Sequence, residues 1–133
     1  MPAYPERLAA LLHKVEGASI FEGATPIGLN DQDYTGDTPL HIVCRWDDFD
    51  STDLLVQAGA NVNAVGDKSQ TPIFCTGSRR IAEMLVKAGA TLTIVDSFGC
   101  TPEEFARRVG NIEIVEFLNQ RKRGNRTNGP GSN

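Results

Sequence analysis

A Thr-Pro pair occurs three times in this chain at nearly constant spacing, and each pair opens a stretch typical of a helix. The three copies read "GDTPLHIVC" at residues 36–44, "SQTPIFC" at 69–75 and "GCTPEEFA" at 99–106. The threonines of the first two copies lie 33 residues apart, and those of the last two lie 30 apart. Self-similarity at such a period predicts small units that stack on one another, because no single unit could bury its own apolar face.

Each unit reads as helix, short turn, second helix, glycine stop and extended finger. Threonine suits the N-cap of a helix and proline suits the first helical position, where no backbone N–H is needed. Gly59 and Gly89 are expected to end the second helices in the left-handed conformation. Apolar pairs at one phase of the repeat are expected to fill the core, namely Leu54–Leu55, Met84–Leu85 and Phe117–Leu118.

The first copy, "DYTGDTPLHIVC" followed by "LLVQAGANVNA", resembles the ankyrin repeat, whose signature is D-x-x-G-x-T-P-L-H and later L-L-x-x-G-A-x-x-N. The second copy departs from it, with Gly66 in the Asp place, Ser69 in the Gly place and Phe74 in the His place. The third has Glu104 in the His place. The resemblance implies an all-α fold, an ankyrin-repeat solenoid of about three stacked helix-turn-helix repeats with an N-terminal capping helix.

The expected organisation has three parts. Residues 1–30 form the capping helix and a connection, because Leu8, Leu11, Leu12 and Val15 share one helical face. Residues 31–120 form the repeats, and 121–133 form a disordered polar tail. The repeats span about 33–66, 67–95 and 96–120.

Two local features within the repeats are also predicted. The second repeat is three residues short, so its first helix is expected to be about one turn long. Asp50, with Asp53 three residues later, is expected to cap the second helix of the first repeat.

The charge is unevenly distributed. Residues 1–66 hold ten acidic and three basic side chains, whereas residues 67–133 hold seven and ten. The acidic first half is a poor binder of phosphates and could steer a basic partner, although it could equally be a solvated surface. We expect no nucleic acid partner, no membrane segment and a cytoplasmic location, and the three cysteines are expected to be reduced.

His41 and Cys44 lie one turn apart on the first helix, a spacing that could support a thiolate or a metal. No second histidine, carboxylate pair or phosphate loop accompanies them. We therefore expect no catalytic residue, no metal and no cofactor, and a cysteine-dependent enzyme is the remote alternative. His41 is expected to be a structural histidine that bonds backbone across the neighbouring turn.

The resemblance implies target contacts at the finger tips and at the ends of the first helices. Trp46 is the only tryptophan, and an exposed aromatic beside arginine is typical of an interface hot spot. Alternatively, Trp46 or Phe49 packs under the N-terminal helix. The end of the third first-helix adds Arg108 and Val109 to these positions. The predicted partner-binding residues are Tyr34, Thr35, Asp37, Arg45, Trp46, Asp47, Asp48, Asp67, Lys68, Gln70, Arg79 and Phe98.

The predicted function is a non-catalytic protein–protein interaction module that binds its partner through the concave face formed by fingers and inner helices. One form of this function, by analogy with small ankyrin-like proteins, is a bacterial immunity protein that inhibits a cognate toxin or effector enzyme with a basic surface. The alternative is a scaffold or host-directed adaptor with no inhibitory role. The two forms differ in whether binding blocks the partner's activity.

Overall fold

Seven α-helices and one 3₁₀ turn form the secondary structure of this computed structural model, which describes residues 4–22 and 26–128. Within these ranges the β pairing is limited to one isolated bridge, between Phe21 and Asp33. The prediction of an all-α fold is therefore confirmed. The elements are α1 (Tyr4–Glu16), α2 (Pro39–Arg45), α3 (Phe49–Gln57), η1 (Asp67–Ser69), α4 (Pro72–Cys75), α5 (Arg79–Lys87), α6 (Pro102–Val109) and α7 (Ile112–Asn128).

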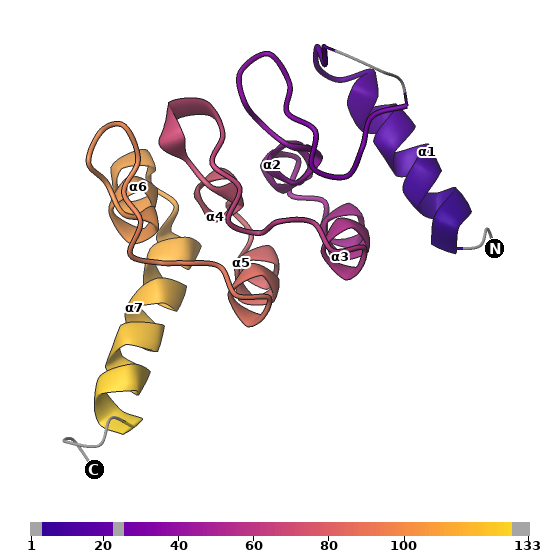
Figure 1. Ribbon diagram of the computed structural model, residues 1–133. Coiled ribbons are helices and arrows are strands. Elements are labelled where there is room, and N and C mark those ends of the chain that lie inside the picture. The colour runs from indigo at the N-terminus through magenta and orange to yellow at the C-terminus, as the bar shows by residue number, and fades with distance from the viewer. Residues whose placement is uncertain (1–3, 23–25, 129–133) are drawn as a thin grey trace.

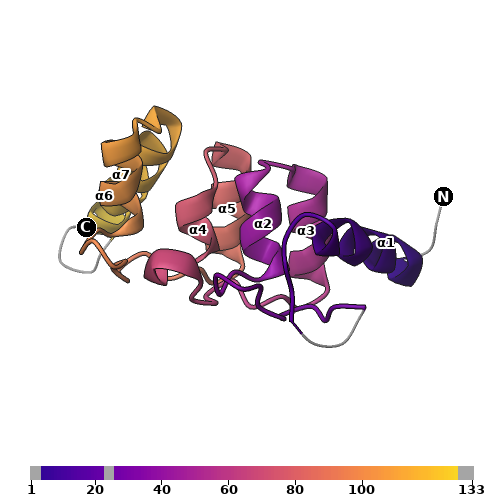
Figure 2. The same ribbon diagram turned by 90° about the horizontal axis from the view of Figure 1, so that it is seen from above.

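The helices form two layers. Helices α2, α4 and α6 make an inner layer, α3, α5 and α7 make an outer layer, and finger loops project beside the inner helices (Figure 1). Helix α1 packs against α2 and α3 at the N-terminal end of the stack, and α6 and α7 lie at the other end (Figure 2). This is the predicted solenoid of three helical pairs with a capping helix.

The Thr-Pro pairs start the inner helices as predicted, with an extended threonine before each proline. Gly59 and Gly89 follow the outer helices with φ of 99° and 102°, which is the left-handed conformation expected of them. The predicted cap by Asp50 is wrong. Asp48 is the N-cap of α3, because its carboxylate accepts a hydrogen bond from the Ser51 backbone N–H at 3.2 Å.

The His position of the repeat is occupied by a different residue in each unit, and two of the three residues link successive units. His41 in α2 bonds to the second finger, as predicted, with its Nε2 2.9 Å from the Gln70 carbonyl oxygen. Phe74, its counterpart in α4, contacts Phe105 of α6 edge-on with the ring centroids 5.9 Å apart. Glu104, the counterpart in α6, closes a capping box with Thr101 instead.

Asparagine side chains form a second series of links, which join each loop after an outer helix to a neighbouring loop. The Asn30 side-chain oxygen accepts from the Asn61 backbone N–H at 2.9 Å, and the Asn63 oxygen accepts from Thr91 N–H at 2.8 Å.

The core runs without interruption from α1 to α7. Its fully buried members include Val15, Leu40, Val43, Leu55, Ile73, Ile81, Leu85 and Ile114.

The shortened second repeat has the predicted short inner helix, since α4 contains four residues. Its finger differs from the other two. Gly66 stands where Asp33 and Asp96 organise their fingers, and the chain forms the 3₁₀ turn η1 with φ of 57° at Lys68 and 58° at Ser69. Positive φ at two side-chain-bearing residues in succession costs conformational energy.

The C-terminal prediction needs correction. Helix α7 continues to Asn128, whereas the sequence predicts a disordered tail over residues 121–133. The run from Gln120 to Arg123 consists of good helix formers, and basic residues suit the negative end of the helix dipole. The remaining part of the predicted tail, 129–133, lies outside the described residues.

Candidate partner-binding surface

The finger side of the molecule comprises the three finger tips together with the C-terminal ends of α2, α4 and α6. The tips are residues 34–36, 67–69 and 97–99. In the first and third fingers, an aspartate placed before the tip holds the loop by accepting backbone N–H groups. These loops therefore present their tip side chains from a fixed backbone.

Asp33 organises the first finger. Its carboxylate accepts hydrogen bonds from the Thr35 backbone and hydroxyl at 2.9 and 2.6 Å, from Asp37 N–H at 2.9 Å and from the Ser19 hydroxyl at 2.6 Å. Burial alone would raise the pKa of Asp33, but these hydrogen bonds outweigh it and hold the pKa below its ordinary value. Thr35 is thus engaged within the loop, whereas the Tyr34 side chain is 69% exposed.

Asp96 organises the third finger in the same way. Its Oδ1 accepts from the backbone N–H groups of Phe98 and Cys100 at 2.9 and 3.0 Å. Burial acts to raise the pKa of Asp96, but the bond from the Gln70 side chain and those backbone bonds hold it below its ordinary value. Phe98 at the tip is 59% exposed.

Asp37 and Gln70 do not belong to the exposed surface that was predicted to contain them. Asp37 is buried, and its carboxylate bonds to Arg45 Nη2 and to the Asp67 backbone N–H, both at 2.9 Å. Gln70 is also buried, and its amide donates to Asp96 at 3.0 Å. Both side chains join one finger to the next.

Asp47 and Asp48 also serve the internal structure. Asp47 adopts φ of 55°, and its Oδ1 accepts from the Thr76 hydroxyl at 2.6 Å and from Gly77 N–H at 2.9 Å. Asp48 caps α3, and the hydrogen bonds from Ser51 hold its pKa below the ordinary value. The aspartates predicted to attract a basic partner are therefore hydrogen-bonded between and within repeats.

Arg79 lies away from the finger side. It begins the outer helix α5, and its guanidinium bonds to the Gln120 side chain at 2.9 Å. The same group lies 5.4 Å from the centroid of the Phe117 ring, on the outer helix α7. Arg79 therefore connects two outer helices, and its prediction as a partner contact is not supported by this position.

Trp46 was expected to be either an exposed interface residue or a side chain packed under the N-terminal helix, and it is intermediate between the two. Its side chain is neither core nor free, since it is 38% exposed and Lys14 of α1 lies over the ring, 5.3 Å from its centroid. Phe49 is half-buried, and Arg80 stacks on its ring at 3.8 Å. Both aromatic rings thus contact a cation, which sits over their faces as a cation–π pair requires.

The third repeat forms a hollow on the finger side. A cavity of about 220 Å³ is lined by Phe98, Phe105, Arg108 and Val109. Phe98 and Val109 are 59% and 54% exposed. The resemblance points to three of these residues, but Phe105 was missed. Phe105 directly follows Glu104, which stands in the His position of the repeat. This place on the inner helix could have indicated that its side chain lies beside the third finger.

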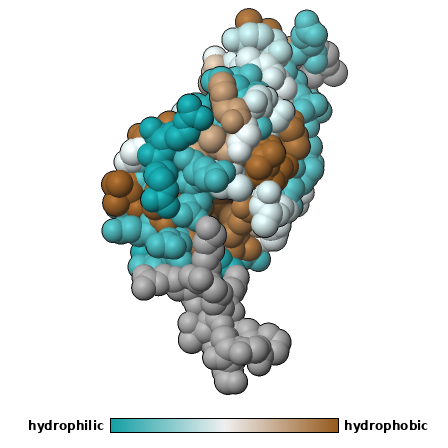
Figure 3. All heavy atoms as spheres, turned by 90° about the vertical axis from the view of Figure 1, so that its left-hand side faces the viewer, coloured by the Kyte–Doolittle hydropathy of each residue, from teal (hydrophilic) through white to brown (hydrophobic). Residues whose placement is uncertain are grey.

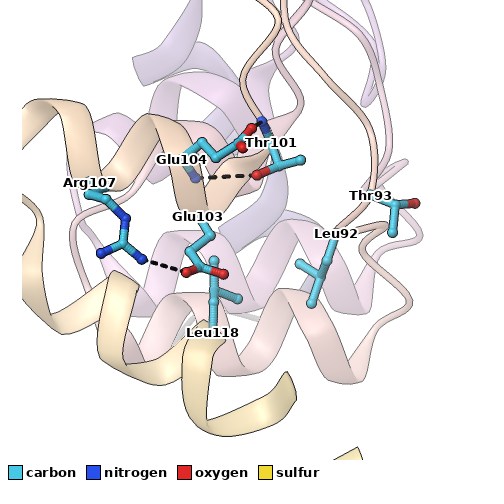
Figure 4. A pocket seen from close by; sticks show the side chains of 7 residues that line it. All are labelled: Leu92, Thr93, Thr101, Glu103, Glu104, Arg107 and Leu118. Atoms are coloured by element: carbon cyan, nitrogen blue, oxygen red, sulfur yellow. Dashed lines mark hydrogen bonds and ion pairs between the residues drawn. The ribbon is translucent and has the colours of Figure 1, made fainter. Parts of the chain in front are cut away.

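The end of the stack beyond the third repeat is polar. Glu103 and Arg107 stand where the first repeat has Leu40 and Cys44, and their side chains form an ion pair at 2.7 Å. This pair lies beside Leu92 and Leu118 around a cavity of about 400 Å³ (Figure 4). On this end of the molecule, hydrophobic side chains are visible as separate patches among hydrophilic ones (Figure 3).

The cysteines give no support to thiolate chemistry. All three are free thiols, and burial raises the pKa of Cys44 and raises that of Cys75 to about 11. Arg45 lies 3.7 Å from the Cys75 sulfur and opposes the shift without reversing it. The thiols of Cys44 and Cys75 are therefore protonated at neutral pH. Within the described residues no three His, Cys, Asp or Glu side chains group as metal ligands would.

Comparison with known proteins finds similarity to ankyrin-repeat proteins. The ankyrin-repeat model matches residues 35–67. A putative ankyrin repeat protein of Borreliella burgdorferi is 28% identical over 88 residues, which is 64% of this chain and 40% of that protein. Rabankyrin-5 of Mus musculus is 30% identical over 93 residues, which is 67% of this chain and 8% of that protein.

One relative has an enzyme's name. Glycerophosphocholine phosphodiesterase GDE1 of Candida albicans is 30% identical over 104 residues, but these cover 74% of this chain and only 9% of that protein. The chain thus spans less than half the length of each of these relatives, so their whole-protein activities are not carried over. In the described part of the chain, no helix has the length and apolar character that crossing a bilayer requires. The repeats, the stacking and the matched segment together show that the chain belongs to the ankyrin-repeat family.

Proposed function

We propose that this protein is a non-catalytic interaction module that binds another protein through its finger side. The observation that carries the proposal is the exposure of large side chains on tips with a fixed backbone. Tyr34 and Phe98 are 69% and 59% exposed, while Asp33 and Asp96 hold the loops beneath them by several hydrogen bonds each. Aromatic side chains presented from a rigid backbone lose little entropy on binding.

The membership of the family supports the general form of this proposal, because ankyrin repeats bind other proteins. The inhibitory form, an immunity protein against a toxin or effector enzyme, is a finer proposal. It draws on the acidic first half of the chain, and the hydrogen bonding of Asp37, Asp47 and Asp48 within the stack weakens that argument for direct contact with a basic surface. An adaptor role fits the finger side equally well. The cytoplasmic location stays a prediction.

The test of the proposed function compares two sets of substitutions on opposite sides of the stack. The first set removes exposed finger side chains, in the combined variant Tyr34→Ala, Lys68→Gln and Phe98→Ala. The matched control changes three exposed residues of the outer helices, Gln57→Ala, Lys87→Ala and Glu116→Ala. Both variants should keep the melting temperature of the parent, because these side chains lie on the surface.

Each protein is then used to isolate partners by cross-linking in lysate of the cells that produce it, with quantitative mass spectrometry. We expect a partner that the parent and the outer-helix variant retain and the finger variant loses. A partner that the finger variant retains and the outer-helix variant loses would contradict the proposal. Adding the purified protein to the isolated partner and measuring the partner's activity then separates an inhibitor from an adaptor.

A further inference from the structure

Arg45 and Arg108 occupy the same place in the first and third repeats, but they have different partners. Each arginine lies eight residues after a residue at the base of its own finger. Arg45 reaches back to Asp37, with Nη2 2.9 Å from the carboxylate. Arg108 reaches back to Cys100, with Nη1 3.5 Å from the sulfur.

The difference matters for the charge of the finger side. The carboxylate of Asp37 forms an ion pair with the Arg45 guanidinium, whereas Cys100 offers Arg108 a sulfur in place of a carboxylate. The charge of Asp96 acts on Arg108 from beyond ion-pair distance, and its carboxylate accepts hydrogen bonds from two backbone N–H groups and from Gln70. Glu104 bonds to Thr101 N–H at 2.9 Å. Among the described residues, no carboxylate lies within ion-pair distance of Arg108.

This guanidinium borders the cavity of the third repeat. Phe98, Phe105 and Val109 supply the apolar part of its wall. Phe105 is held from behind by its edge-on contact with Phe74. The pocket therefore combines the held ring of Phe105, the exposed ring of Phe98 and the cation of Arg108. Protein interfaces use such aromatic rings as anchors and such cations in charge pairs.

We infer that the third-repeat pocket, formed by Phe98, Phe105, Arg108 and Val109, receives a hydrophobic side chain from an acidic segment of the partner protein. The carboxylate next to that side chain pairs with the Arg108 guanidinium, and Lys68 on the neighbouring finger adds to the attraction. This inference rests on the proposed function and specifies the chemistry of its partner. It differs from the basic partner predicted from the overall charge of the first half.

The experiment uses two pools of short synthetic peptides with identical hydrophobic residues. In one pool aspartate and glutamate flank the hydrophobic residue, and in the other lysine and arginine do. Both pools are passed over the immobilised full chain, and the retained peptides are quantified by mass spectrometry. The proteins compared are the parent, Phe98→Ala, Arg108→Glu and, as a control for the charge change on the outer side, Lys87→Glu.

We expect the parent and Lys87→Glu to retain acidic peptides over basic ones by about tenfold or more, the size of a single good charge pair at an interface. Phe98→Ala should weaken retention of the acidic pool, and Arg108→Glu should reverse the preference. Retention of the basic pool, equal retention of both, retention of neither, or an unchanged preference in Arg108→Glu would each overturn the inference. Melting curves confirm that each variant is folded.

The two proposals can fail separately. If the isolated partner is lost from the finger variant but the peptide preference is absent, the binding function stands and the acidic partner segment is wrong. If the partner is retained by the finger variant, the binding function itself is wrong, whatever the peptides do.

Discussion

His41 joins the first inner helix to the second finger through the carbonyl oxygen of Gln70, 2.9 Å from its Nε2. Its other ring nitrogen, Nδ1, accepts the backbone N–H of Thr38 at 3.0 Å. Since Thr38 N–H must donate, Nδ1 carries no proton and Nε2 carries one. The buried imidazole is therefore neutral, and protonation would place a hydrogen against Thr38 N–H.

This arrangement predicts a pH dependence of stability. Burial is the largest cause that lowers the pKa of His41 below its ordinary value of 6.5. A depressed folded pKa means that the unfolded chain binds the proton more readily, so stability is fully present above about pH 6.5 and falls as the pH drops toward the folded pKa. Urea unfolding curves measured from pH 8 downward should show this loss.

The chain contains a control for this measurement. His13 is the other histidine, and its side chain is 87% exposed on α1. His41→Gln should lower stability and remove most of the slope between about pH 7.5 and 5.5, and His13→Gln is the comparison variant that removes the exposed histidine instead. An identical slope in parent and His41→Gln would show that another group is responsible.

Leu85 tests the packing between repeats. Its side chain is fully buried at the centre of the stack, so Leu85→Ala would leave a cavity between units. We expect a loss of about 3–5 kcal/mol in the free energy of unfolding. Val95→Ala, at a 51% exposed position of the following finger, should cost well under about 1 kcal/mol. Equal costs for the two variants in denaturant unfolding would refute the register of the repeats.

Gly66 tests the junction of the first two fingers. A Cβ atom added there would meet the Asp37 carboxylate and the His41 ring, two groups fixed by their own hydrogen bonds. Gly66→Ala should therefore cost about 1–3 kcal/mol, as overpacking in a rigid site does. Gly77→Ala is the comparison, since its nearest contacts at 3.6 Å leave room for a methyl group. A Gly66→Ala variant as stable as Gly77→Ala would contradict this geometry.

Ser69 offers a stabilising substitution. It adopts φ of 58° at the position where Gly36 and Gly99, in the other fingers, adopt 98° and 79°. Ser69→Gly should raise the free energy of unfolding by about 0.5–1 kcal/mol, because relief of the left-handed conformation exceeds the entropy that glycine adds to the unfolded chain. Gly36→Ser, the reverse change in the first finger, should lower stability. A rise in stability for both would exclude this explanation.

The stack itself could be predicted from sequence because its signals are local. Thr-Pro pairs start helices, Gly59 ends one, and apolar pairs recur at one phase of the repeat. The same reasoning reached the His41 bond to the neighbouring finger and the single-turn α4. Each depends on residue types at short spacing.

The surface was harder to predict because the repeats themselves supply the partners of its polar residues. Asp37 and Gln70 look like exposed finger residues until folding brings Arg45, Asp67 and Asp96 to them. Asp47 bonds to Thr76 and Gly77, about thirty residues away in the next repeat. Which acids of a repeat remain available to a partner thus depends on contacts between repeats.

Hydrogen–deuterium exchange on the isolated complex tests the central claim, binding through the finger side, most directly. The amide exchange of the full chain is compared with and without the partner recovered by the cross-linking experiment. We expect slower exchange in the tips 34–36, 67–69 and 97–99 and at the end of α6, with the exposed face of α3, α5 and α7 unchanged. Protection confined to those outer helices, with the finger tips exchanging as in the free protein, would contradict binding through the finger side.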